Sequence, residues 1–295
     1  MRRKMAGMMA ALVLAAALPA ALTAALASTA QASETLERIK DRGSIVLGVR
    51  DDRPPMSFRD GEGKMVGFSV DLCLAVSEEV RKALSLEVLP VVFKAVTVEE
   101  RFDAVVSGEV DILCGATTKT LSRQEKVDFT DLTFVTGATL MSVAENRVPG
   151  IEALQGRTVT VVRDTTTLEV LRERLEEAGI AANVLEVEDS QAGIQALLNG
   201  RASAYAGDQV VLIGLALSDR SGTRYAISPK LFSFEPFALA VQRDDADFRL
   251  LANRALAALN RSGRIQAIYR LWFSQFAKEP PELLKALWVL GATPE

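Results

Sequence analysis

Short apolar runs rich in β-branched residues alternate with amphipathic helical stretches in two separate regions of the chain. In the first region, the pattern predicts strands at Ile45–Val49, Leu86–Phe93 and Val110–Cys114, with helices at Ser69–Leu84 and Val98–Ser107. Strands separated by helices of this length are typical of a mainly parallel α/β architecture, because each helix returns the chain to the start of the next strand.

The same alternation returns in the second half of the chain. Strands are predicted at Thr158–Val162, Val184–Val187 and Ala202–Ala206, and helices at Leu168–Ala178, Ala192–Leu198 and Gln209–Leu217. Two units with only a few strands each favour two lobes over one large sheet.

Two extended runs, Thr133–Val143 and Phe237–Gln242, follow the first and the second unit. We expect each run to be a strand that crosses between lobes, so that the two crossings form a hinge with the ligand cleft between the lobes. The tail Asp247–Phe276 is predicted to form two helices that pack back on the first lobe. The predicted division places 33–140 and 240–295 in lobe 1 and 141–239 in lobe 2.

The first 32 residues have the order of a secretory signal peptide. A cationic start, Arg2-Arg3-Lys4, precedes an Ala- and Leu-rich stretch, and Ala30-Gln31-Ala32 supplies two small residues around one position, so we expect cleavage after Ala32. A permanent membrane anchor is the alternative, but the stretch is mostly Ala and is interrupted by Pro19 and Thr23. We therefore expect export to the periplasm as a free soluble protein.

The charge balance and the lack of histidine limit the chemistry of the chain. The full sequence has a net charge of −4, and removal of the signal peptide takes away basic residues and no acid. An acidic protein has no electrostatic reason to bind nucleic acid or anionic membranes. The absence of histidine removes the commonest general base and the commonest metal ligand. We therefore expect no enzyme activity, no metal site and no cofactor.

Cys73 and Cys114 are the two cysteines of the chain. An exported protein can keep a disulfide, but two cysteines are too few for a disulfide framework. One bridge between them and two separate buried thiols are both open interpretations of the sequence.

Polar residues of the first unit follow the predicted strands, at the edge where open α/β sheets bind ligands. Arg50 directly follows the first strand, and Arg101 lies in a first helical turn, where a positive charge opposes the helix dipole. The loop Gly115–Arg123 offers threonine hydroxyls, and Arg123 can hold a carboxylate with two parallel bonds. Each has a plainer alternative. Arg50 could be an exposed charge in a turn, Arg101 could lie on the surface, and Gly115–Arg123 could be an ordinary polar loop.

The second unit repeats this arrangement in the segment Arg163–Glu169. Thr166 and Glu169 have capping-box spacing, which predicts free N–H groups of a helix N-terminus in the cleft. Asp208 follows a strand and suits a ligand ammonium group, although it could equally well only cap the helix that starts at Gln209. Together the two units suit a zwitterion, and a second ligand carboxylate suits their arginines better still.

Several motifs keep the order and spacing of a known family. They are Gly48-Val49-Arg50, Gly67–Leu72, Val110–Thr118 with Arg123-Gln124, Val127–Thr130, Gly200-Arg201-Ala202 with Asp208, and Ile268-Tyr269 with Trp272-Phe273. On these residues the chain resembles the periplasmic amino-acid-binding proteins of ABC importers, solute-binding protein family 3, with the glutamate/aspartate-binding branch closest. The resemblance implies the type II periplasmic-binding-protein fold, with two α/β lobes joined by two hinge strands around the ligand cleft.

The resemblance also implies roles for individual residues. In that family, the residue matching Arg123 holds the ligand α-carboxylate, assisted by the one matching Thr118, and the acid matching Asp208 holds the α-amine. Residues matching Arg50 and Arg101 bind the side-chain carboxylate in the glutamate/aspartate branch.

The chain also departs from that branch. Val98 and Ala116 stand where the branch places serines, Thr165 replaces a glycine, and Ser190 falls near its histidine. Arg163 stands where some relatives place a lysine that touches the ligand. The predicted ligand-binding residues are Arg50, Arg101, Ala116, Thr118, Arg123, Arg163, Thr166, Thr167 and Asp208.

The resemblance predicts a monomeric binding protein for glutamate, aspartate or a related polar amino acid, with the membrane permease of an ABC importer as partner. A periplasmic dehydratase on the same scaffold is the alternative. That chemistry needs an acid or base in the cleft without a charge partner, and the sequence pattern indicates no such group. A receptor sensor domain would need a second membrane segment or a signalling domain, and the sequence has neither.

Overall fold

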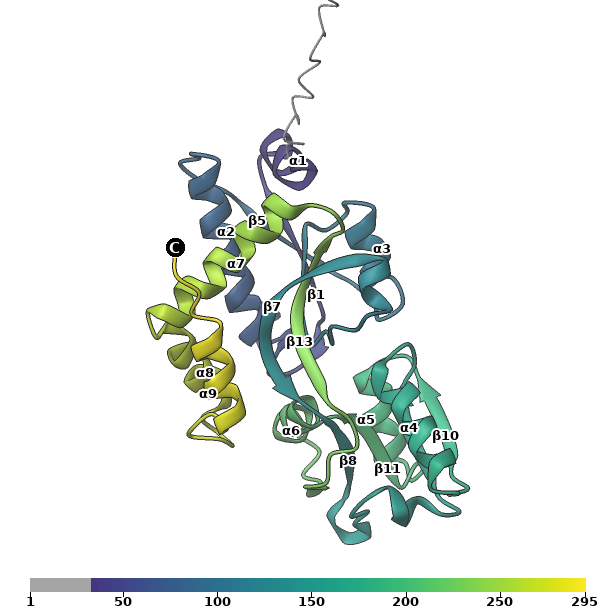
Figure 1. Ribbon diagram of the computed structural model, residues 1–295. Helices are drawn as coiled ribbons and strands as arrows, with labels where there is room; N and C mark the ends of the chain where they lie inside the picture. The colour runs from purple at the N-terminus through teal and green to yellow at the C-terminus, as the bar shows by residue number, and fades with distance from the viewer. Residues whose placement is uncertain (1–32) are drawn as a thin grey trace, which may run out of the picture. The chain divides into compact units, whose positions relative to one another are not determined.

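The first of two five-stranded sheets is built around three parallel strands. In this computed structural model, which describes residues 33–295, β1 (Ile45–Val49) pairs in parallel with β5 (Val91–Ala95) and β6 (Ile112–Cys114). β13 (Glu235–Gln242) runs antiparallel to β6, and β7 (Val127–Thr136) runs antiparallel to β13, beside which it lies in Figure 1. The strand order is β5-β1-β6-β13-β7. The predicted signal peptide, 1–32, lies outside the described residues.

The second sheet repeats this plan. β9 (Thr158–Val162) pairs in parallel with β10 (Asn183–Val187) and β11 (Ala204–Asp208). β8 (Ala138–Val143) runs antiparallel to β11, and β12 (Tyr225–Ile227) runs antiparallel to β8. The strand order is β10-β9-β11-β8-β12. The two-lobed α/β architecture predicted from the sequence is therefore confirmed.

Helices cover both faces of each sheet, which is why the parallel strands are apolar runs. In the first lobe, α2 (Phe68–Ala83) and the C-terminal helices share a core with one face of β1, and α3 (Arg101–Val106) packs on the other face. The helices of the second lobe are α4 (Thr166–Glu177), α5 (Ser190–Leu198) and α6 (Gln209–Ser218).

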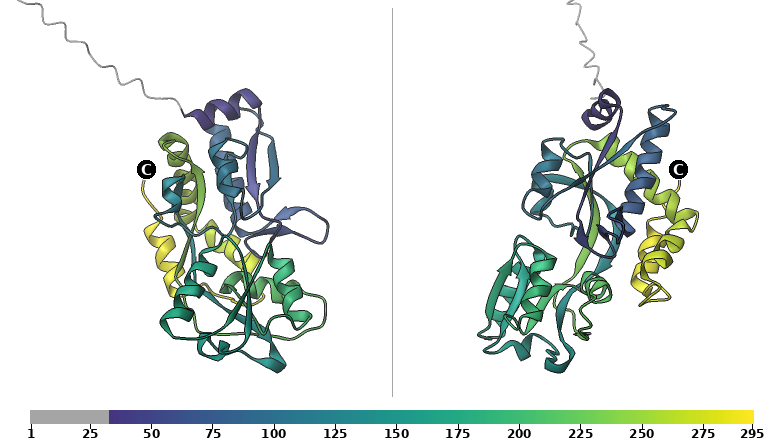
Figure 2. Two further views of the ribbon diagram at one scale, coloured as in Figure 1. Left: turned by 90° about the vertical axis from the view of Figure 1, so that its right-hand side faces the viewer. Right: turned by 180° about the vertical axis from the view of Figure 1, so that it is seen from behind.

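The C-terminal segment forms α7 (Ala246–Arg261), α8 (Arg264–Phe273) and α9 (Glu282–Leu290). This segment packs on the first lobe, as predicted, and the views in Figure 2 show it beside that sheet. The sequence pattern did not predict α9 or the first helix, α1 (Glu34–Arg42).

The shorter elements lie mainly at the ends of the large ones. They are β2 (Asp52–Arg53), β3 (Ser57–Arg59), β4 (Met65–Val66), and the single-turn helices η1 (Arg123–Glu125), η2 (Ala144–Asn146) and η3 (Ile151–Leu154). β2, β3 and β4 form a small antiparallel sheet that follows β1. Within residues 33–295, no helix has the length and apolar character needed to span a bilayer.

The chain changes sheet twice, and the two crossings touch. The first change is at Gly137, between β7 and β8, and the second lies within 228–234, between β12 and β13. A Cβ atom added at Gly137 would lie 2.4 Å from the carbonyl oxygen of Ser233, so only glycine fits this contact. The predicted run Thr133–Val143 contains the first crossing, whereas Phe237–Gln242 lies within β13 and the second crossing comes before it. The predicted boundaries after residues 140 and 239 therefore fall inside β8 and β13.

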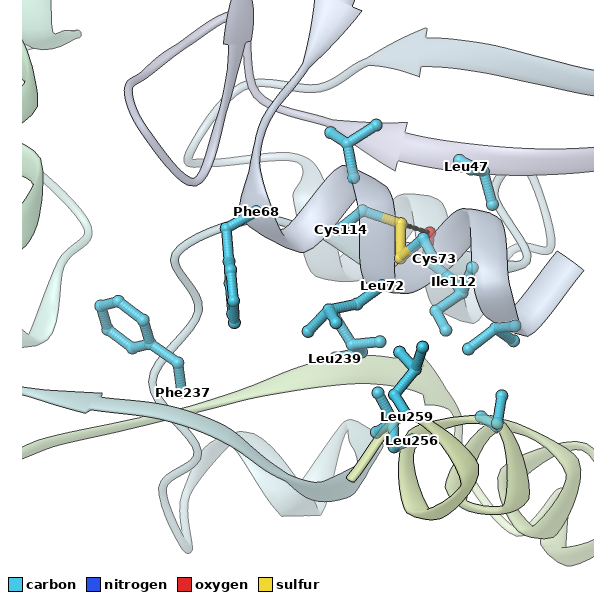
Figure 3. Packing of buried hydrophobic residues seen from close by; sticks show 14 of the residues in the cluster. Leu47, Phe68, Leu72, Cys73, Ile112, Cys114, Phe237, Leu239, Leu256 and Leu259 are labelled. Carbon is cyan, nitrogen blue, oxygen red and sulfur yellow. Dashed lines mark hydrogen bonds between the residues drawn. A yellow bond between two sulfur atoms is a disulfide. The ribbon is translucent and has the colours of Figure 1, made fainter. Parts of the chain in front are cut away.

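A disulfide joins α2 to the end of β6. Cys73 and Cys114 are bridged with their Cα atoms 6.2 Å apart, and both residues are fully buried. Figure 3 shows the bridge among Leu47, Leu72 and Leu239 of the first-lobe core. The alternative of two separate thiols is therefore wrong.

We expect replacement of both cysteines by alanine to lower the free energy of unfolding by about 2–4 kcal/mol. The bridge closes a segment with a sequence separation of 41 residues, which restricts the unfolded chain. Guanidinium unfolding of the double variant and of the oxidised protein measures the difference. Reductant should leave the variant's transition unchanged, and equal midpoints for the two proteins would show that the bridge does not stabilise the fold.

Candidate functional site

A small inner cavity lies between the two lobes. Every predicted ligand-binding residue except Arg163 lines it, and Arg53, Val98, Thr117 and Thr165 complete its wall. The first lobe supplies the arginines from the end of β1, from β2, from α3 and from η1, and the second lobe supplies the start of α4 and the end of β11. The carboxyl ends of parallel strands in both sheets thus meet at one place.

Four guanidinium groups face this cavity: those of Arg50, Arg53, Arg101 and Arg123. Burial and the neighbouring Arg53 lower the pKa of Arg50 to about 10, against attraction by nearby acids. Burial, followed by repulsion from Arg123 and Arg50, lowers the pKa of Arg101 to about 9. All four groups remain protonated at neutral pH, so the cavity concentrates positive charge.

Asp52 balances part of this charge and also connects the lobes. Its Oδ1 lies 2.8 Å from Arg50 Nη2 and 3.6 Å from Arg53 Nε, and its Oδ2 accepts a bond of 2.9 Å from the N–H of Ser190 at the start of α5. Burial alone would raise the pKa of Asp52, but Arg53, Arg50 and this N–H keep it below the ordinary value. The carboxylate therefore bonds to both lobes while it is ionised.

The ring of Phe102 holds two of the arginines. The Cζ atom of Arg101 lies 4.4 Å from the ring centroid and that of Arg123 lies 5.3 Å from it. Arg101 also donates to the carbonyl of Asp164 in the second lobe at 3.1 Å, and Arg123 donates to the carbonyl of Thr118 at 2.8 Å. Each of the two guanidinium groups keeps further N–H donors for a ligand.

Asp208 does not act as a side-chain cap of α6, although it stands at the cap position. Its buried Oδ1 has no hydrogen-bond partner in the described structure. Burial raises the pKa of Asp208 to about 7, the negative charge of Glu235 adds to this, and Arg53 and Arg123 oppose it. The carboxylate is available for a donor group of a ligand.

The cap of α4 is Thr165 rather than the predicted Thr166. The hydroxyl of Thr165 accepts from the N–H of Leu168 at 3.2 Å, which leaves the hydroxyl of Thr166 to bond Glu235 at 2.8 Å. Glu235 begins β13 and is 1% exposed.

Sequence reasoning missed Arg53, Phe102 and Glu235. Arg53 lies in a highly charged turn and Glu235 in the second crossing, and neither position carries a strand-end or helix-start pattern. A signal in the sequence was available for Phe102 only, through its position next to Arg101.

Arg163 is the predicted site residue that the structure places elsewhere. Its exposed guanidinium pairs with Glu188 at 2.9 Å, and both residues line a larger outer cleft of about 1030 Å³. Arg50 and Val98 line both the outer cleft and the inner cavity, so the two spaces adjoin. The local pairing with Glu188 explains why Arg163 does not reach the other arginines.

The inner cavity has a volume of about 30 Å³, which is room for roughly two water molecules. An amino acid needs considerably more space. In this arrangement the lobes are therefore too close at the inner cavity to hold an amino acid there.

Comparisons with known proteins identify the family of the chain. The model of the bacterial extracellular solute-binding proteins, family 3, matches residues 45–275. An L-glutamate/L-aspartate-binding protein of Pseudomonas aeruginosa is 33% identical over 242 residues, which cover 82% of this chain and 80% of that protein. A glutamate/aspartate import solute-binding protein of Salmonella typhimurium is 30% identical, over 84% of this chain and 81% of its own.

Solved structures show the same fold. The solute receptor for L-cysteine of Neisseria gonorrhoeae aligns with a TM-score of 0.73 at 26% identity, covering 84% of this chain and 97% of that chain. This likeness confirms the type II periplasmic-binding-protein fold predicted from the sequence.

We expect Asp208 to make the ligand-free protein less stable as the pH rises. The pKa is about 7 in the folded state and near 3.8 when unfolded, so the folded state binds an extra proton between these values. The free energy of unfolding then falls by up to about 1.4 kcal/mol per pH unit between pH 4 and pH 7, and levels off above. Urea unfolding at several pH values should show this contribution in the wild type and its loss in Asp208→Asn. Parallel pH profiles for the two proteins would contradict the assignment.

Proposed function

Because the chain belongs to the family 3 bacterial extracellular solute-binding proteins, we propose that it is the periplasmic substrate-binding subunit of an amino-acid ABC importer. Its ligand is an amino acid with an acidic side chain, glutamate or aspartate before others. The protein leaves the cytoplasm through a cleaved signal peptide at 1–32, binds its ligand as a monomer and delivers it to a membrane permease.

One observation carries the ligand assignment: four guanidinium groups share a cavity in which Asp208 is the facing acid. A neutral amino acid brings one carboxylate, which the fork of Arg123 alone can bind. A second carboxylate relieves the repulsion that lowers the pKa of Arg101 and supplies acceptors for Arg50 and Arg101. The ligand ammonium group then pairs with Asp208.

The contacts between the lobes support a binding cycle of opening and closure. Asp52 accepts from Ser190, and Arg101 donates to Asp164, so each contact joins a residue beside the cavity to the opposite lobe. A ligand held by Arg50 and Arg101 lies next to both contacts. Ligand binding and closure therefore favour each other.

A dehydratase-type enzyme is the second candidate, because Asp208 lines the inner cavity and can be protonated near neutral pH. Sequence reasoning expected no such group. Two arginines near Asp208 favour a role as counter-ion over a role in proton transfer. Incubation with prephenate or arogenate and analysis for product separates the two functions, and we expect no product.

Replacement of single arginines should distinguish the one that binds the ligand α-carboxylate from the one that binds the side-chain carboxylate. Arg123→Ala is expected to abolish binding of every amino acid, because it removes the partner of the α-carboxylate. Arg101→Ala should cost about 2–5 kcal/mol for glutamate or aspartate and leave residual glutamine binding nearly unchanged. Titration calorimetry measures both effects.

The matched control for these variants is Arg163→Ala, since the guanidinium of Arg163 pairs with Glu188 outside the inner cavity. We expect it to bind as the wild type does. Tighter binding of glutamine, asparagine or a basic amino acid than of both acids by the wild-type protein would refute the acidic ligand.

Small-angle scattering tests the opening of the lobes. Because the closed cavity is too small for an amino acid, the ligand-free protein should have a larger radius of gyration than the closed arrangement, and saturating ligand should reduce it. A radius that stays constant although calorimetry shows binding would argue against closure in solution.

A further inference from the structure

Glu235 is a buried carboxylate behind the wall of the inner cavity. Its Oε2 accepts hydrogen bonds from the hydroxyls of Thr118 at 2.5 Å and Thr166 at 2.8 Å, and its Oε1 accepts from Ser233 at 2.6 Å. Thr118 and Thr166 line the cavity, whereas Glu235 does not. Glu235 can therefore act on a ligand through the two threonines and, by its charge, through Asp208.

The three hydroxyls come from three parts of the fold. Thr118 follows β6 of the first lobe, Thr166 begins α4 of the second lobe, and Ser233 lies in the second crossing between the sheets. The hydroxyls of Thr118 and Thr166 are 3.4 Å apart. Glu235 thus holds together, across the lobe boundary, two side chains on the same wall of the cavity.

The bonds to Glu235 fix what these hydroxyls offer to a ligand. A hydroxyl has one hydrogen to donate and two lone pairs to accept with, and a carboxylate only accepts. Because Thr118 and Thr166 each donate their hydrogen to Oε2, both present lone pairs to the cavity. The unpartnered Oδ1 of Asp208 lines the same space. Thr118, Thr166 and Asp208 together form an acceptor wall, and the arginines that line the same cavity supply donors.

We propose that Glu235 is a positioning residue for the ammonium group of the ligand, because it fixes the hydroxyls of Thr118 and Thr166 as acceptors near Asp208. The inference rests on the proposed function, since it requires a ligand with an amine. It also changes the role that the family resemblance implies for Thr118: its hydroxyl, already donating to Glu235, serves the amine rather than the carboxylate. An ammonium group has only donors, so this acceptor wall selects ligands that carry one.

A cycle of variants tests the proposal. Glu235→Gln keeps the shape of the side chain, but its amide group donates, so at least one threonine hydroxyl must turn round. We expect a loss of about 10-fold or more in L-glutamate affinity by calorimetry. In a Thr118→Val and Thr166→Val background the same change should cost clearly less affinity, because no hydroxyls remain to be oriented and only the charge effect on Asp208 is left.

A second measurement separates positioning from support of the fold. Glutarate has both carboxylates of L-glutamate and lacks the amine, so Glu235→Gln should weaken its binding far less than that of L-glutamate. Arg163→Ala, which changes a residue outside the inner cavity, is the control, and we expect it to bind L-glutamate as the wild type does. Thermal unfolding of each variant verifies that it is folded.

The outcomes distinguish the inference from the proposed function. A wild-type protein that binds no amino acid would overturn the proposed function. Intact wild-type binding with an equal loss from Glu235→Gln in both backgrounds, or an equal loss for both ligands, would overturn the positioning role alone.

Discussion

Four guanidinium groups share one cavity, and the carboxylates around them decide how the lobes meet. Burial lowers the pKa of Arg101, and repulsion from the neighbouring guanidinium groups lowers it further. Asp52 in the first lobe offsets this repulsion with one carboxylate oxygen. Its other oxygen accepts a hydrogen bond from the N–H of Ser190 in the second lobe. Glu235 likewise bonds hydroxyls from both lobes. Charge compensation and lobe closure are therefore carried by the same side chains.

The sheets could be predicted because their signal is local. A strand buried on both faces must be apolar along its length, and Ile45–Val49 and Thr158–Val162 were predicted with the bounds that the structure has. Elements half covered by solvent were predicted less well. The strand expected at Leu86–Phe93 begins at Val91, because apolar residues also occur in the extended chain before it. Helix α9 was missed although Pro281 stands at its N-cap and Gly291 at its C-cap, which are start and stop signals in the sequence.

The residues of the candidate site could be predicted where they follow a strand closely. Arg50 and Asp208 are predicted from strand ends and Arg123 from the loop after a strand, and all three line the inner cavity. Arg53 and Glu235 were not, because their roles come from partners far away in the chain: Glu235 lies 117 residues from Thr118 and 69 from Thr166. Arg163 also follows a strand, but the structure places it at the outer cleft, where it pairs with Glu188.

The departures from the glutamate/aspartate branch follow from the same balance of donors and acceptors. Val98 and Ala116 line the cavity without hydroxyls, so they offer the arginines no alternative partner. Arg53 adds a fourth fork near Asp208, and its positive charge opposes the rise in the pKa of that acid. A guanidinium group that no hydroxyl shares must be satisfied by the ligand or by water, so this pocket depends strongly on the charges of its ligand. Discrimination between an acidic amino acid and its amide should therefore rest on the arginines themselves.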